Sequence, residues 1–114
     1  MSCPFCWPNR DNLDIVWDPQ WLSIRVIRPL NPVTEGHVLV INLRHHSHDA
    51  AADPTAAADL MFVAAEYVEK EGIQANIITS VGPDATQTVF HTHVHVVPRR
   101  PNDGLALPWT GQKK

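Results

Sequence analysis

The chain has little that would direct it to a membrane or to nucleic acid. Its longest aliphatic run, Val38–Ile41, has the length of a strand and is far too short to cross a bilayer. A formal net charge of −3 over 114 residues provides no basic surface for a nucleic-acid polymer, although Arg99 and Arg100 form a local basic pair. No basic region followed by an apolar stretch opens the chain, so we expect no secretion signal and a cytoplasmic protein. This length predicts a single domain over residues 1–114.

Cysteine is scarce, and both cysteines lie in the segment Cys3-Pro4-Phe5-Cys6. In a reducing compartment, such a pair is more typical of a metal site, a catalytic site or free thiols than of a disulfide. No strand precedes the pair, as a thioredoxin-like redox site requires. Two thiolates on one tight turn would supply half of a tetrahedral zinc site, and two free thiols in an N-terminal turn are the alternative.

Histidine, in contrast, is frequent, and three of the seven histidines alternate within residues 90–97. The β-branched and aromatic residues between them predict a strand. Alternation sends His91, His93 and His95 to one face, and it sends the apolar and β-branched residues to the other. Along a strand, His91 and His95 stand roughly 13 Å apart, so the three histidines cannot grip one metal ion together.

The remaining pattern predicts four further strands and one long helix. We expect strands over residues 13–17, 21–27, 37–42 and 77–81, with the last one joined to the histidine strand by a short loop and therefore antiparallel to it. A helix should follow Asp53, a good N-cap, with Pro54 at its first position and Gly72 at its end. Its apolar stripe places Met61 in the core.

The histidine row admits three interpretations. It could be the polar outer face of a strand, or His91 and His93 could chelate a catalytic metal that keeps an open position for water. In the third interpretation a central histidine is a nucleophile, because neutral imidazole attacks phosphorus near pH 7 and forms a phosphohistidine that water then cleaves. The flanking histidines would stabilise the charge, and Gln87 and Thr88 could complete the cradle. This interpretation uses every histidine of the row.

Residues 91–97, His-Thr-His-Val-His-Val-Val, resemble the motif of the histidine triad (HIT) superfamily. Residues 32–41 together with Arg44-His45 resemble the middle segment of that family. Residues 87–90 before the histidines and residues 103–105 after them also match. The similarity extends from about Cys3 to Trp109, which is nearly the whole chain.

The resemblance implies an α+β, HIT-like fold: an antiparallel sheet of about five strands with one long helix and a possible short one packed on it, usually in a homodimer. It implies a nucleotide ligand and hydrolysis or nucleotidyl transfer at the α-phosphate of nucleoside phosphoramidates, dinucleoside polyphosphates or related conjugates. His93 would be the nucleophile, and His95 would contact the phosphate and assist the leaving group. His91 and His37 would support the site by hydrogen bonding. The substrate would be contacted by Gln87, Thr88 and Ser80.

In zinc-bearing members, the resemblance implies a structural metal held by four residues of this chain. They would be Cys3, Cys6, His45 and His91, with His46 as the alternative to His45. Such a zinc would tie the N-terminus to the histidine strand and leave His93 available for phosphate.

Three positions depart from the family pattern. Pro29 stands where many relatives carry an acidic residue that hydrogen-bonds the ribose, and Ser80 stands where an Asn often occurs. Thr86 replaces a Gly, and because a β-branched residue resists positive φ, we expect a differently shaped phosphate loop. Two other functions therefore stay open: a nucleotide- or zinc-binding module with little turnover, and a metal-dependent hydrolase that uses His91 and His93.

Overall fold

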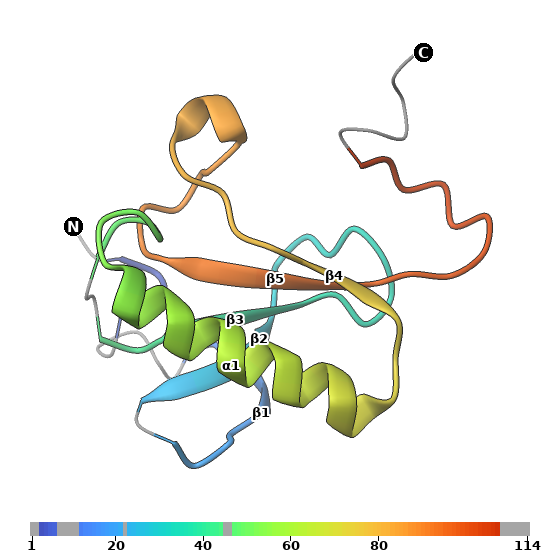
Figure 1. Cartoon of the computed structure of the whole chain (residues 1–114), viewed down its shortest axis with the longest axis horizontal. Helices are drawn as coiled ribbons and strands as arrows, with labels where there is room; N and C mark the ends of the chain where they lie inside the picture. The colour runs from blue at the N-terminus through green and yellow to red at the C-terminus, as the bar shows by residue number, and fades with distance from the viewer. Residues whose placement is uncertain (1–2, 7–11, 22, 45–46, 108–114) are drawn as a thin grey trace.

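The computed structural model describes residues 3–6, 12–21, 23–44 and 47–107. Within them, five strands form one antiparallel sheet in the order β1-β2-β3-β5-β4, and one long helix lies across a face of this sheet (Figure 1). The elements are β1 (Asp14–Trp17), β2 (Ile24–Arg28), β3 (Val38–Asn42), α1 (Pro54–Glu71), β4 (Ala75–Ile78), the 3₁₀ turn η2 (Pro83–Ala85) and β5 (His93–Pro98). This architecture confirms the predicted fold class. No helix among the described residues is both long and apolar enough to span a bilayer.

The long helix α1 begins and ends where its capping residues predict. The Asp53 carboxylate accepts a hydrogen bond from the Ala56 backbone N–H at 3.1 Å, and Gly72 ends the helix in the left-handed conformation at φ 63°. The prediction for Met61 is wrong, because its side chain is 44% exposed. The buried stripe of α1 consists of Leu60, Val63, Ala64 and Tyr67. Met61 directly follows Leu60 and is therefore rotated from it by about 100° around the helix axis, outside that stripe.

The central strand β3 is buried on both faces and divides the core in two. Val38 and Val40 pack under α1, together with Val94 and Val96 of β5. Leu39 and Ile41 point to the opposite face and pack with Phe5 of the N-terminal turn. The register of the β3–β5 pair sets His95 opposite Leu39 and His93 opposite Ile41. Since paired residues share a face of the sheet, both histidines project on the face away from α1.

The strand that carries the histidines is shorter than its sequence pattern predicts. It begins at His93. Phe90, one of the apolar residues that the alternation places on the face opposite the histidines, lies before the strand and is 46% exposed. Before the strand, the Thr92 N–H donates a hydrogen bond to the Ser47 carbonyl at 3.1 Å, which takes this part of the chain out of the ladder. Strand β4 likewise ends at Ile78, so Ser80 lies in the loop that follows rather than in the sheet. Consequently His91 does not share the strand of the other two histidines.

Candidate active site

His93 presents one nitrogen to a backbone acceptor and leaves the other available. Its Nδ1 lies 2.7 Å from the carbonyl oxygen of His91. Because a carbonyl only accepts hydrogen bonds, Nδ1 must carry the proton, so the lone pair of the neutral ring is on Nε2. Burial lowers the pKa of His93 below its ordinary value, although the hydrogen bond to His91 opposes that shift. Near pH 7 the imidazole is therefore neutral, which is the form that a nucleophile requires.

The proton of His95 is placed by a chain of hydrogen bonds that starts at the backbone of Val33. The Val33 N–H donates to His37 Nδ1 at 3.1 Å, which leaves the His37 proton on Nε2. That Nε2–H then donates to His95 Nδ1 at 3.0 Å. The remaining proton of His95 therefore sits on Nε2. Burial, helped by the neighbouring His93 and His37, lowers the pKa of His95 to about 4, so His95 acts as a neutral N–H donor at pH 7.

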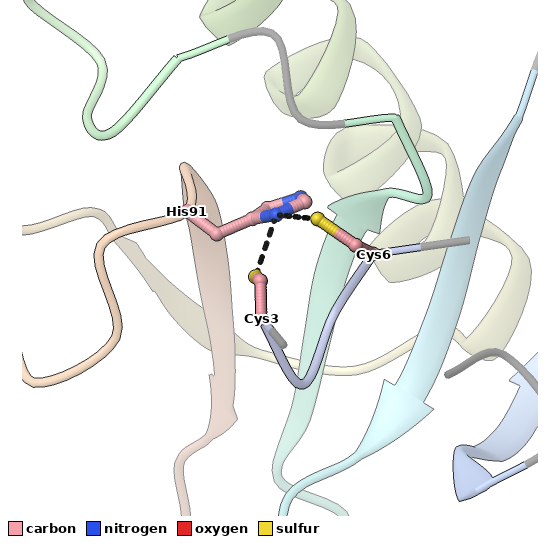
Figure 2. Close-up of side chains that lie close together, drawn as sticks. All are labelled: Cys3, Cys6 and His91. Atoms are coloured by element: carbon pink, nitrogen blue, oxygen red, sulfur yellow. Dashed lines mark hydrogen bonds between the residues drawn. The ribbon is translucent and has the colours of Figure 1, made fainter. Parts of the chain in front are cut away.

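His91 faces the cysteine pair rather than the other two histidines. Its ring is 1% exposed, and its Nε2–H donates to the Asn42 carbonyl at 2.6 Å, so the lone pair is on Nδ1. Figure 2 shows this Nδ1 directed at the two sulfurs of the N-terminal turn. The distances from Nδ1 are 3.2 Å to Cys3 Sγ and 3.5 Å to Cys6 Sγ.

These three side chains could hold a metal ion, because their ligand atoms all lie within 4.8 Å of one another. The set of two thiols and one imidazole suits zinc, and the Asn42 carbonyl orients the imidazole in the way that outer hydrogen bonds to ligand histidines usually do. Burial and the adjacent Cys3 raise the pKa of the Cys6 thiol to about 11. A raised pKa disfavours the thiolate that binds a metal, but a divalent cation would itself stabilise both thiolates. The predicted fourth ligand, His45, and its alternative His46 lie outside the described residues.

Phe5, between the two cysteines, packs against two of the histidines. Its ring centroid lies 5.7 Å from that of His91 and 5.3 Å from that of His93, and both contacts are edge-to-face. The sequence reasoning missed Phe5, as it missed the carbonyl of Asn42 and the N–H of Val33. An apolar residue between two cysteines is a weak signal in sequence, and backbone groups give none at all.

The loop between β4 and β5 contains the three predicted substrate residues. Gln87 is buried, and its amide donates to the carbonyl of His48 at 2.6 Å and to that of Val89 at 3.1 Å. Its Oε1 accepts from the Gly82 N–H at 2.8 Å, so this side chain holds the loop closed. Thr88 is exposed, and Ser80 is half-buried. Contact of these residues with a substrate stays a prediction.

Thr86 adopts a conformation that its side chain disfavours. Its φ of 69° and ψ of 22° are left-handed, and its N–H donates to the Pro83 carbonyl at 2.9 Å to close η2. Thr86 therefore adopts the positive φ that its β-branched side chain resists, and a phosphate loop shaped differently from that of relatives stays a prediction. The loop keeps the turn that a Gly would favour, and Thr86 bears the strain.

Comparison with known proteins agrees with this geometry. The HIT domain family model matches residues 20–102. An uncharacterised HIT-like protein of Mycobacterium tuberculosis is 34% identical over 94% of this chain and 78% of its own length. The adenosine 5'-monophosphoramidase of Schizosaccharomyces pombe is 27% identical over 96% and 84%. The structure of a zinc-bound histidine triad family protein from Mycobacterium smegmatis superposes with a TM-score of 0.75, at 31% identity over 93% and 81% of the two chains. The fold is that of a histidine triad protein, and the chain belongs to the HIT domain family.

Proposed function

We propose that this protein is a nucleotide hydrolase or nucleotidyl transferase that works through a covalent phosphohistidine on His93. Its substrates would be nucleoside phosphoramidates, dinucleoside polyphosphates or related nucleotide conjugates, cleaved at the α-phosphate. Membership of the HIT family and the activity named for the fission yeast relative support this reaction class.

The observation that carries the proposal is the proton position on His93. The hydrogen bond from Nδ1–H to the His91 carbonyl leaves the lone pair on Nε2, at an imidazole that burial keeps neutral. In the first step the bond from Nε2 to the α-phosphorus forms, and the leaving group departs with its electron pair. In the second step water or another acceptor attacks phosphorus and gives up a proton to solvent, while the Nε2–phosphorus bond breaks and its electron pair returns to Nε2. Solvent supplies the matching proton to the leaving group.

His95 and His37 would support this chemistry without changing their charge. The Nε2–H of His95 would donate a hydrogen bond to the phosphoryl group or to the leaving atom, where negative charge increases during the reaction. His37 would hold the His95 proton on that nitrogen through the 3.0 Å hydrogen bond. Thr88 and Ser80 would contact the substrate, while Gln87 would act from the loop that its side chain closes.

We also propose a structural zinc on Cys3, Cys6 and His91, with His45 as the fourth ligand. Zinc would link the N-terminal turn to the histidine segment through thiolates and an imidazole. The donor set in the structure and the zinc-bound relative support this assignment. Metal analysis of the wild type beside a Cys3→Ser variant tests it, and equal, negligible zinc in both proteins would refute it.

A turnover panel of adenosine phosphoramidate and diadenosine polyphosphates tests the reaction. His93→Asn is the sharpest variant, because its side-chain amide can still donate to the His91 carbonyl but has no nucleophilic lone pair. We expect turnover and a nucleotidyl adduct by mass spectrometry in the wild type, and neither in His93→Asn. Undiminished turnover in that variant would eliminate the proposed nucleophile.

The two other functions make different predictions in the same assay. A binding module would form a tight nucleotide complex without turnover. A metal-dependent hydrolase would lose activity on chelation while remaining folded. That function needs His91 and His93 on one ion, whereas the unprotonated Nδ1 of His91 faces the two cysteines. The homodimer that the family resemblance implies is a further proposal, which sedimentation would test. The cytoplasmic location, expected from the sequence, would be tested by fractionation.

A further inference from the structure

The turn between the two cysteines reaches the nucleophile through a single side chain. The Cys6 N–H donates to the Cys3 carbonyl at 3.2 Å, so the turn is tight and Phe5 is confined at its centre. Phe5 is only 8% exposed and packs among the apolar residues on the face of the sheet away from α1. Its ring contacts His91 and His93 together.

We infer that Phe5 is a positioning residue through which the Cys3, Cys6 and His91 cluster controls the orientation of the His93 ring. The inference rests on the proposed role of His93 as the nucleophile. It assigns to the CxxC turn a function in catalysis that is separate from holding the chain together.

The His93 ring needs such a support. Rotation about the terminal torsion of a histidine is broad and nearly two-fold, so a ring is easily turned over unless its neighbours prevent this. A ring flip would break the 2.7 Å hydrogen bond to the His91 carbonyl and turn Nδ1 away from it. The ring is in contact with Phe5 at 5.3 Å and with His95 at 5.1 Å between centroids. Phe5 therefore opposes the flip from outside the strand that carries both histidines.

The Cys3, Cys6 and His91 cluster fixes the position of Phe5. Both neighbours of the Pro4-Phe5 dipeptide are cysteines whose sulfurs face His91 Nδ1, so closing the cluster fixes the turn at both ends. The same His91 residue supplies the carbonyl that accepts the His93 proton. Metal binding at the cluster would thus hold both groups that orient the His93 ring. It would hold the His91 carbonyl through the backbone and the Phe5 ring through the turn.

Phe5→Leu tests the inference, because it keeps apolar volume in the core while removing the aromatic edge. Leu13→Ala is the matched control, since Leu13 packs against the same apolar cluster. Each protein, reconstituted with zinc, is examined for metal content, for steady-state kinetics with adenosine phosphoramidate, and for the His93 tautomer by long-range ¹H–¹⁵N correlation.

In the wild type we expect a single His93 tautomer with the proton on Nδ1. In Phe5→Leu, zinc content should be unchanged, the His93 signal should average between tautomers, and kcat should fall about tenfold with KM within about twofold. Chelation of zinc should produce the same change of tautomer in the wild type and no additional change in Phe5→Leu. Leu13→Ala should match the wild type in all three measurements.

An unchanged tautomer and kcat in Phe5→Leu would overturn the inference, as would a chelated wild type that keeps its single tautomer. Loss of zinc in Phe5→Leu would show that the ring serves the cluster itself, and would also overturn it. Failure of the proposed function is distinguishable, because a wild type without turnover on the panel still shows whether its His93 tautomer depends on Phe5.

Discussion

His37 offers a test of whether the proton on His95 is set from a distance. Its ring is 5% exposed and makes two hydrogen bonds, accepting from Val33 and donating to His95. His37→Leu removes both while retaining a side chain that fills the space. Without the donor, His95 is free to carry its proton on Nδ1, where it cannot reach a substrate.

The size of the effect follows from one net hydrogen bond, about 1 kcal/mol, which corresponds to about a fivefold fall in kcat. The free energy of unfolding should fall by about 1–2 kcal/mol, because the Val33 N–H and His95 Nδ1 lose their partner. His37→Gln is the matched variant. Its amide oxygen and nitrogen are separated by one carbon, as are the two ring nitrogens of histidine, so it can accept from Val33 and donate to His95.

The measurement is single-turnover cleavage of adenosine phosphoramidate, with urea unfolding and the tautomer of His95 recorded on the same samples. We expect His37→Gln to stay within about threefold of the wild-type rate while His37→Leu falls further. Equal rates in His37→Leu and the wild type, with His95 protonated on Nε2 in both, would refute the reasoning that His37 sets this tautomer.

Three further outcomes are expected. Chelation should leave the covalent chemistry of His93 detectable as a nucleotidyl adduct at a reduced rate; an adduct that forms only with zinc present would count against His93 as an independent nucleophile. Because the folded pKa of His95 is about 4 and its ordinary value is 6.5, the unfolded chain binds this proton first as the pH falls, so His95 destabilises the fold between these values. As the pH falls from 7 to 4.5, the free energy of unfolding of His95→Gln, measured in urea, should therefore rise by about 1–2 kcal/mol relative to that of the wild type. This figure is reduced for partial exposure of the ring. A difference between the two proteins that does not change with pH would contradict the prediction. Thr86→Gly should raise the free energy of unfolding by about 0.5–1 kcal/mol, since relief of left-handed strain exceeds the added entropy of the unfolded chain, and a less stable Gly variant would show that no strain is stored there.

Much of the site could be predicted because it depends on local patterns. Alternation along residues 93–97 placed His93 and His95 on one face of a strand, and the register of β5 with β3 agrees. The caps of α1 were readable because Asp53 and Gly72 act on backbone within a turn of themselves. The close spacing of Cys3 and Cys6 likewise indicated half of a metal site, and in the structure both sulfurs lie near one nitrogen of His91.

The predictions failed where distant parts of the chain compete for the same groups. The His91–His95 pattern suggested one continuous strand, but hydrogen bonds between Thr92 and Ser47, 45 residues apart, separate His91 from the ladder. Met61 fitted an apolar stripe, but the face of α1 that packs on the sheet is the one that carries Leu60, Val63, Ala64 and Tyr67, so Met61 is 44% exposed.

The amino-acid sequence by itself determined the side chains of the candidate site: a histidine row with the periodicity of a strand, a cysteine pair on a turn, and a family motif around both. Only the tertiary structure decided which nitrogen of each histidine is protonated. Those protons depend on Asn42 for His91, on the His91 carbonyl for His93, and on His37 and Val33 for His95. The physical reason is that a neutral imidazole has one donor and one acceptor, and their assignment belongs to partners that, for His91 and His95, lie 49 and 58 residues away in the chain.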